Sequence, residues 1–397
     1  MITTPVTRIR DHAGQMPMRV ALRATSLGVW RETTWRDYWD QVELVGHALL
    51  DLGLTVGDRV AIQSENRPEW LAADMGALAV RATSVGIDPS SPVAEVQHVL
   101  SHSGAVVLVA EDQEQVDKAL EVLEQCPGLR HIVYVEPRGI RNRYDHSALT
   151  SWDELLERGR RHRQDNADAV TQRMAEARGS DVATVAYASH PADPPEGVVL
   201  SVDTVESALR RLVLEESFAS PPPGPSDLSV SCLPLRHVAE RMLTTWCYGA
   251  AGTQVSFAQS PDQVAASLRE VQPTILYGVP RLWEELHAGV LTRVGDASWF
   301  KRKHATFWMR RADRSSRLAY AIGWVVFFRP LRERLGLRHV RHAWSSAAPI
   351  APDVLRFFRG IGVPIHQVDC LTGNTAMAMG NGPSDGLLES TYSGRGR

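Results

Sequence analysis

The feature that most constrains this chain is a regular alternation of helical and extended patterns along most of its length. From Thr34, apolar residues recur at helical spacing until Gly53, a residue suited to end a helix. Short apolar strands and amphipathic helices then alternate over residues 58–135, and a second series covers residues 228–344. Alternation at this spacing predicts an α/β fold built from doubly wound parallel sheets.

The two series predict two similar α/β subdomains. We expect the first to comprise residues 1–180 and the second residues 181–380, followed by a polar C-terminal tail at residues 381–397. With 397 residues, of which 44% are hydrophobic, the chain is long enough to bury one large core or two.

Overall charge argues against two classes of partner. The chain carries 43 basic and 46 acidic residues, a net charge of -3, so it offers no bulk electrostatic basis for binding nucleic acid or an anionic membrane. The basic clusters at residues 158–163 and 301–317 are interpreted as solvated helix faces. The most apolar run, residues 318–328, is far shorter than the roughly 20 residues that cross a bilayer. It predicts a buried or interfacial helix and no transmembrane segment.

Cysteine spacing and the N-terminal composition favour a cytoplasmic location. The four cysteines are widely spaced and form no C-x-x-C pair, which disfavours a zinc site and a disulfide framework. The N-terminus lacks the apolar stretch of a secretory signal. We therefore expect reduced thiols and no leader.

The stretch from Tyr187 to Val198 reads Y-A-S-H-P-A-D-P-P-E-G-V, and three of its prolines fall within residues 191–195. It follows a short run of small and β-branched residues, so the pattern predicts a strand that ends in a loop. In register, it resembles the phosphate-binding loop of the adenylate-forming acyl-CoA synthetases, Y-T-S-G-T-T-G-x-P-K-G-V. The shared frame consists of Tyr187, Ser189, Pro195, Gly197 and Val198.

The positions that would contact phosphate differ from the family pattern. His190 and Asp193 replace glycines, Pro191 and Ala192 replace threonines, and Glu196 replaces the lysine. A phosphate cradle needs close backbone N–H groups, hydroxyl donors and a cation, whereas proline has no N–H and the acids repel phosphate. Exchanging a cation for an anion there costs on the order of 8 kcal/mol before screening.

Further motifs extend the resemblance over about residues 30–380. Residues 52–70 resemble the opening of the long-chain fatty acid–CoA ligases, and the polar loop Glu65, Asn66 and Arg67 within them is interpreted as a cap on a strand end. Residues 233–241 match L-P-L-x-H-x-x-E-R, residues 271–286 match V-x-P-T-x-x-x-x-V-P-R-x-W-E, and residues 345–350 match S-G-A-A-P-L with Ser346 for the glycine.

The resemblance implies two sets of binding residues. The nucleotide would contact Ser189, Ala347, Ala348, Pro349 and Thr372. The carboxylate gate and acyl tunnel would be formed by His237, Tyr248, Tyr277, Gly278 and Val279, a pocket that depends on apolar walls. The alternative is that these five are ordinary core residues at strand ends.

A second motif also departs from the family. Where the family has Y-G-x-T-E, with a threonine on phosphate and a glutamate on magnesium, this chain has Asp369, Cys370, Leu371, Thr372 and Gly373. Thr372 matches, but glycine offers no oxygen ligand to a hard cation. We also expect the family's ribose-binding T-G-D segment and its mobile C-terminal domain to be missing, since the sequence stops about 25 residues later.

Three functions remain open. The favoured one is a pseudoenzyme, defective in ATP-dependent adenylation, that binds a fatty acyl molecule or a protein partner. The first alternative is an active long-chain fatty acid–CoA ligase that uses ATP, Mg²⁺ and CoA. The second is a repurposed cavity in which Cys370 and His190, near Asp193, Glu196 and Asp369, form a nucleophile or bind a metal. Apolar edges left by the missing part would favour a homo-oligomer or a partner.

Overall fold

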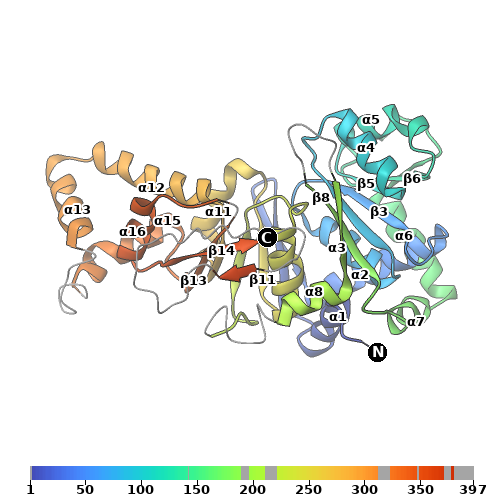
Figure 1. The fold of residues 1–397 in the computed structure, drawn as a ribbon, viewed down its shortest axis with the longest axis horizontal. Coiled ribbons are helices and arrows are strands. Elements are labelled where there is room, and N and C mark those ends of the chain that lie inside the picture. Colours follow the sequence, from blue (N-terminus) through green and yellow to red (C-terminus); the bar gives the residue numbers. More distant parts are fainter. Residues whose placement is uncertain are drawn as a thin grey trace, which may run out of the picture. The chain divides into compact units, whose positions relative to one another are not determined.

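The computed structural model describes residues 2–141, 143–188, 196–210, 221–311, 322–346, 348–370 and 377–379. The chain divides into two compact units, whose elements are labelled in Figure 1. The first unit is built mainly from Met1–Pro225 and Pro234–Gln259, and the second from Ser226–Leu233 and Ser260–Leu371.

A seven-stranded sheet forms the centre of the first unit, in the order β7-β6-β5-β3-β4-β8-β9. Neighbouring strands are parallel except for the antiparallel pair β8 and β9. The strands are β3 (Arg59–Gln63), β4 (Thr83–Ile87), β5 (Ala105–Ala110), β6 (His131–Tyr134), β7 (Leu149–Ser151), β8 (Val182–Ala188) and β9 (Glu196–Ser201). The predicted α/β fold with parallel sheets is confirmed.

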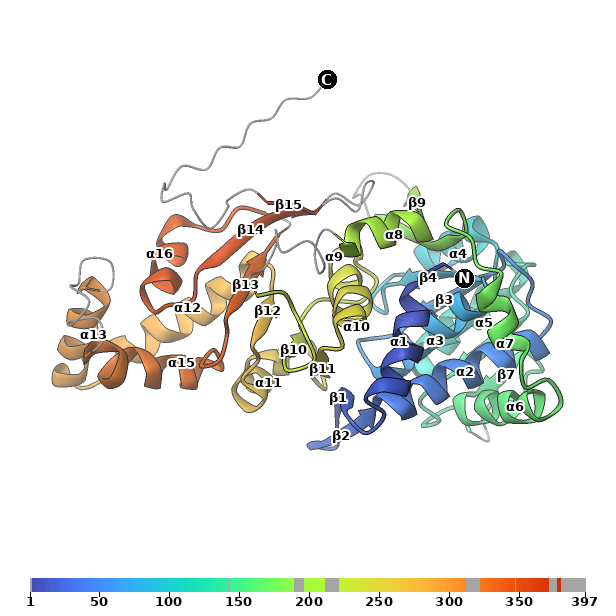
Figure 2. The ribbon, with the colours of Figure 1, turned by 90° about the horizontal axis from the view of Figure 1, so that it is seen from below.

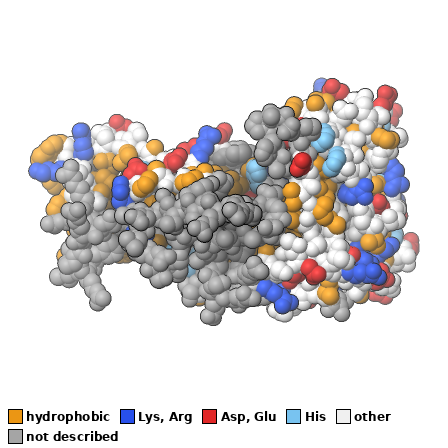
Figure 3. All heavy atoms as spheres, viewed as in Figure 1, with side chains coloured by type: hydrophobic (Ala, Val, Ile, Leu, Met, Phe, Trp, Pro, Cys, Tyr) orange, Lys and Arg blue, Asp and Glu red, His pale blue; other side chains and the backbone are white. Residues whose placement is uncertain are grey.

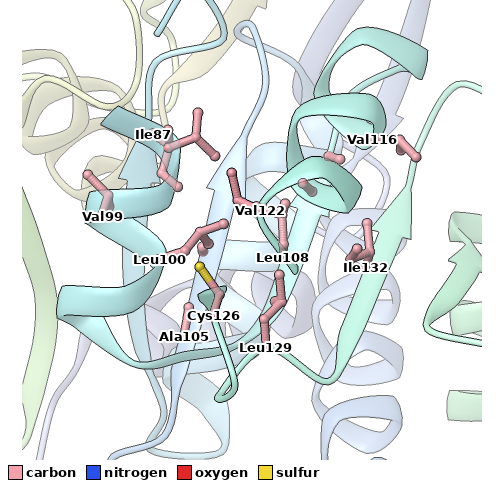
Figure 4. Close-up of a cluster of buried hydrophobic side chains, with 14 of the residues drawn as sticks. Ile87, Val99, Leu100, Ala105, Leu108, Val116, Val122, Cys126, Leu129 and Ile132 are labelled. Carbon is pink, nitrogen blue, oxygen red and sulfur yellow. The ribbon is translucent and has the colours of Figure 1, made fainter. Parts of the chain in front are cut away.

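Helices cover both faces of this sheet. Because crossovers between parallel strands are right-handed, the strand order places α3 (Pro68–Ala79) on one face and α4 (Val93–Ser103) and α5 (Gln113–Glu121) on the other. Figure 4 shows the core under α4 and α5, where Leu100, Val122 and Ile132 pack together. On the α3 side, α2 (Trp35–Asp51) packs against both α3 and α6 (Trp152–Asp165).

The remaining elements of the first unit were in part missed by the sequence patterns. The chain begins with α1 (Pro5–Gln15) and the hairpin β1 (Val20–Ser26) and β2 (Val29–Thr34), and β1 also pairs in parallel with β11 (Gln254–Phe257). The unit is completed by η1 (Leu123–Gln125), α7 (Ala169–Ala175), α8 (Val202–Leu209), α9 (Val238–Glu240), the π-helical η3 (Arg241–Cys247) and α10 (Tyr248–Ala251).

The second unit contains a smaller sheet, β12-β13-β14-β15. Its first three strands are parallel and β15 is antiparallel to β14, and Figure 2 shows β12, β13 and β14 side by side. The strands of this sheet are β12 (Ile275–Tyr277), β13 (His342–Ser345), β14 (Ile365–Cys370) and β15 (Met377–Met379), and the unit also contains β10 (Leu228–Ser231), which is not part of it. The helices are η4 (Pro261–Gln263), α11 (Val264–Val271), α12 (Pro280–Gly295), α13 (Trp299–Arg311), η5 (Trp324–Phe328), α15 (Arg329–Leu335) and α16 (Pro352–Gly360).

The division between the units differs from the boundary expected at residue 181. Strand β8 joins the sheet of the first unit, because Thr83 and Ser84 of β4 donate side-chain hydrogen bonds to the carbonyls of Val182 and Ala183. Residues 181–210 therefore pack with the first unit. No helix in the described part of the chain is long and apolar enough to cross a membrane.

A histidine pair joins α2 to α6. The Nδ1 atoms of His47 and His162 lie 3.0 Å apart, and the His47 side chain is fully buried. At this distance one nitrogen donates its N–H to the lone pair of the other, so the two facing nitrogens cannot both carry a proton. Desolvation, helped by His162 and Arg163, lowers the pKa of His47 from 6.5 to about 4.

This pair predicts a loss of stability in acid. The unfolded chain protonates His47 near pH 6.5 while the folded chain resists until about pH 4, so the unfolding free energy should fall as pH drops through this window. The depressed pKa corresponds to at most about 3 kcal/mol. Urea unfolding of His47→Leu from pH 4 to 7 should give a flatter profile than the parent, whereas the surface variant His146→Gln should retain the parental slope. Parallel profiles for His47→Leu and the parent would remove His47 as the cause.

Candidate functional site

The loop that resembles the family's phosphate-binding loop connects β8 to β9, which pair as an antiparallel hairpin. Ala188 pairs with Glu196 across the ladder, so residues 189–195 form the connection between the two strands. Ser189, His190 and Asp193 belong to this connection and lie outside the described residues. The sequence patterns missed β9, whose pairing fixes both ends of the loop.

Two frame residues of the loop have structural roles. The Tyr187 hydroxyl lies 2.8 Å from His102 Nδ1, and the two rings meet edge to face. Gly197 lies opposite Tyr187, and a Cβ there would come within 2.8 Å of Val185 and 3.1 Å of the Tyr187 ring. The glycine is needed so that the tyrosine ring can lie across the neighbouring strand.

Glu196 stands where the family pattern has its lysine. Its side chain is exposed, and within the described part of the chain it forms no ion pair. No described cation therefore neutralises this carboxylate at the base of the loop. Its charge would act on an incoming phosphate through water, which screens it in part.

The polar loop after β3 is a structural connection. Arg67 forms ion pairs with Glu69, Glu111 and Glu136, and the Asn66 side-chain oxygen accepts a hydrogen bond of 2.8 Å from the Leu235 N–H. Asn66 thus ties the loop to the segment L-P-L-R-H, and Arg67 ties it to the residues that follow β5 and β6. The interpretation of Glu65, Asn66 and Arg67 as a cap on the strand end is confirmed for Asn66 and Arg67, and Glu65 takes part through its backbone N–H to Glu111.

In the second unit, the carboxyl ends of β12 and β13 bring Tyr277 of the predicted acyl set next to Ser346 of the motif at residues 345–350. The hydroxyls of Tyr277 and Ser346 are in hydrogen-bond contact, and both side chains are buried. The Gly278 N–H donates to the Trp344 carbonyl at 3.0 Å. Ligands of doubly wound sheets bind at this edge. Sequence reasoning did not foresee the Tyr277–Ser346 contact, although the serine in place of glycine was its signal.

The rest of the motif at residues 345–350 follows β13 directly. Ala348 and Pro349 are exposed after β13, and the Ile350 N–H donates to the Gln367 side-chain oxygen of β14 at 3.1 Å. Ala347 lies outside the described residues. The motif thus forms an accessible loop anchored by a neighbouring parallel strand.

Gly278 and Val279 position the start of α12. Val279 is the N-cap residue, and the Trp283 indole donates to the Gly278 carbonyl at 3.1 Å. A Cβ on Gly278 would lie 2.6 Å from Leu282. This packing gives both residues a structural role, which is compatible with their also lining a pocket.

His237 and Tyr248 belong to the first unit, whereas Tyr277, Gly278 and Val279 belong to the second. His237 is exposed at the N-cap of α9, and partial desolvation followed by the guanidinium of Arg236 lowers its pKa. Tyr248 is fully buried at the start of α10. Within the first unit, the two side chains therefore have different surroundings.

The second family motif lies at the end of β14. The backbones of Asp369 and Cys370 pair with Ala378 and Met377 of β15. Thr372 and Gly373 follow this strand and lie, like His190, outside the described residues. The predicted pairing of Cys370 with His190 stays a prediction. Among the described residues, no three His, Cys, Asp or Glu side chains are grouped to hold a metal ion.

Two solved structures share the fold of this chain. The anthranilate CoA ligase AuaEII in complex with anthranoyl-AMP superposes with a TM-score of 0.69 at 18% identity, covering 96% of this chain and 62% of that one. The N-terminal domain of FACL13 from Mycobacterium tuberculosis gives a TM-score of 0.62 at 20% identity, covering 94% and 76%.

Residues 9–393 match the family of AMP-binding enzymes, and the chain belongs to that family. It is 28% identical to the long-chain-fatty-acid–CoA ligase ACSBG2 of Xenopus laevis, over 88% of this chain and 48% of the relative. It is also 28% identical to the long-chain-fatty-acid–CoA ligase FadD15 of Mycobacterium bovis, over 90% and 58%. The chain thus spans about half the length of the curated relatives that it matches.

Proposed function

We propose that this chain is a homologue of the long-chain acyl-CoA synthetases that is defective in ATP-dependent adenylation and serves as an acyl- or partner-binding pseudoenzyme. The observation that carries the proposal is Glu196, an exposed carboxylate without a described counter-charge at the lysine position of the loop. In the same loop, Asp193 adds a second acid, and Pro191 has no backbone N–H to donate to a phosphate.

ATP, Mg²⁺ and CoA are the cofactors that the family implies, and the residues present do not fit the nucleotide. The carboxylate of Glu196 repels a triphosphate, and Gly373 has no side chain to hold magnesium. The buried hydroxyl of Ser346 also fills space that the family's glycine leaves open, and it contacts Tyr277. We therefore derive no adenylation step for this chain.

The residues of the predicted acyl pocket support the proposal that the chain binds a fatty acyl molecule. Tyr277 and Gly278 lie at the strand edge where such sheets bind ligands, and the neighbouring side chains of Leu276 and Trp283 are fully buried. A pocket of this kind requires apolar walls and a few polar groups, and no charge complementary to phosphate. The free, largely buried cysteines of the described residues suit the cytoplasmic location that completes the proposal.

An active long-chain fatty acid–CoA ligase is the second candidate. The names of the curated relatives and the preserved hairpin frame of Tyr187 and Gly197 favour it. The repurposed cavity around Cys370 and His190 rests on residues whose side chains are not described, and it remains a third hypothesis.

Isotope exchange between pyrophosphate and ATP separates the first two candidates. With palmitate, Mg²⁺ and millimolar ATP, we expect no exchange above the buffer rate, because the loop lacks the charge to seat a triphosphate. Palmitate should nevertheless bind in calorimetry without nucleotide. Fatty-acid-dependent exchange would establish the active ligase, and absence of both exchange and palmitate binding would leave only the partner-binding form of the proposal.

A further inference from the structure

Exposed apolar side chains are concentrated in one part of the second unit. Of thirteen large hydrophobic side chains exposed among the described residues, seven lie within residues 291–326. Trp299 and Phe300, at the start of α13, are 70% and 73% exposed, and Val325 and Val326 of η5 are also exposed. Large apolar patches on a protein surface mark sites of interaction with proteins or membranes.

A pocket of about 670 Å³ opens among these helices. Its walls come from α11, α12, α13, η5 and α15, and they include Leu286, Val290 and Leu331. Phe300 and Val326 belong both to the exposed set and to the walls of the pocket. The exposed apolar surface is therefore continuous with an apolar interior large enough for part of a lipid chain.

The charges around this pocket are mostly positive. Arg269, Arg293 and Arg334 line it, are exposed, and form no ion pair within the described part of the chain. The acid that lines it, Glu285, is paired with Arg281 at 2.8 Å. The lining of the pocket thus offers three guanidinium groups to an anionic group that binds there.

The sequence of α13 adds to this charge. Trp299–Arg311 contains five Lys or Arg residues and four aromatic residues, and it has no Asp or Glu. Arg302 and Lys303 are exposed, and the Lys303 ammonium lies 5.1 Å from the centre of the Trp299 ring. Figure 3 shows hydrophobic and basic side chains together at the α13 end of the second unit. The basic cluster treated in the sequence as a solvated face is thus interleaved with exposed aromatic rings.

We propose that this surface, the α13 face formed by Trp299, Phe300, Arg302, Lys303, Val325 and Val326, docks on an anionic lipid bilayer. Aromatic rings prefer the boundary between acyl chains and head groups, and cationic side chains bind lipid phosphates. The combination of both on one face matches an anionic bilayer better than a neutral protein surface. The arginines lining the pocket hold lipid head groups while an acyl chain enters it.

The proposal explains how a chain with a net charge of -3 can bind an anionic surface. Attraction by the α13 face is local, because opposing charges farther away than the Debye length of about 10 Å at 0.1 M salt are screened. Docking of the α13 face on a bilayer does not depend on the residues of the phosphate loop. A failure of bilayer binding would therefore not affect the proposed loss of adenylation, and the reverse also holds.

Vesicle co-sedimentation of the 397-residue chain tests the proposal. Phosphatidylcholine vesicles with phosphatidylserine should pellet the protein, and vesicles of phosphatidylcholine alone should not. The variant Arg293→Glu/Arg302→Glu/Lys303→Glu should bind at least about a hundredfold more weakly, since each basic residue near the surface contributes about fivefold and each introduced acid adds repulsion. The control Arg19→Glu/Arg31→Glu/Arg36→Glu changes the net charge equally at exposed arginines of the first unit and should bind like the parent.

A second variant removes the apolar contribution without touching charge. Trp299→Ser/Phe300→Ser changes two exposed side chains, so the variant should fold normally. At high salt, where the charges are screened, it should lose most of its vesicle binding. Equal binding by the two charge-reversal triples would show that the α13 face is not the docking surface. Absence of binding of the parent chain to anionic vesicles would overturn the proposal. So would a dimer of the parent chain that Trp299→Ser/Phe300→Ser abolishes, because it would identify the face as a contact between copies.

Discussion

Replacing Arg241 with methionine is expected to lower the unfolding free energy of the first unit by about 3–5 kcal/mol. The guanidinium is 2% exposed and is paired with Asp74, which is fully buried. It also donates to Ser84 of β4 and Thr184 of β8, and it lies 5.0 Å from the ring centres of Trp70 and Trp246. The variant would leave a buried carboxylate without a partner, which is the costly part of the change.

Two comparisons test this explanation by urea unfolding. Arg236→Met removes a more exposed pair with Asp88 and should cost only about 1 kcal/mol. The double variant Arg241→Met/Asp74→Leu removes both buried charges and should recover most of the loss. If Arg241→Met costs no more than Arg236→Met, the buried pair does not hold η3 against the sheet.

Arg241 also explains a family motif in physical terms. It is the last residue of L-P-L-R-H-V-A-E-R, a segment that sequence comparison alone could place near a ligand. In the structure, its side chain joins α3, β4 and β8 beneath η3. Matching motifs in this chain therefore identify shared architecture as well as a shared site.

Much of the fold followed from hydrophobic periodicity, and the parts that were missed lacked this signal. The strands β3 to β6 are short apolar runs between amphipathic helices, which is the pattern of a buried parallel sheet. The hairpin of β1 and β2 was hidden because its turn is Leu27–Gly28, where both residues have positive φ. Such a turn is normally signalled by Asn-Gly or Asp-Gly. Strand β9 was hidden because it follows three prolines and begins with Glu196 and Gly197.

The candidate site could be predicted as positions but not as contacts. The register of the phosphate loop located Tyr187 and Gly197, yet their cross-strand packing needs the partner strand. The serine at position 346 was visible in the sequence, whereas its hydroxyl contact with Tyr277 depends on the spacing of β12 and β13. Side-chain contacts between elements far apart in sequence require tertiary geometry.

In the function that we propose, the charge at the phosphate loop no longer suits a triphosphate. A lysine attracts phosphate and a glutamate repels it, so reversing Glu196 should raise nucleotide affinity, although exposure to water reduces the gain. Glu124→Lys makes the same change of net charge at an exposed acid elsewhere in the first unit and serves as the control. Restoring one cation leaves Asp193 and Pro191 in place, so the recovered affinity should remain weak.

Calorimetric titration with ATP, with and without Mg²⁺, tests this claim most directly. We expect no saturable heat for the parent chain or for Glu124→Lys at millimolar ATP, and weak binding only for Glu196→Lys. Saturable, magnesium-dependent binding of ATP by the parent chain would contradict the account.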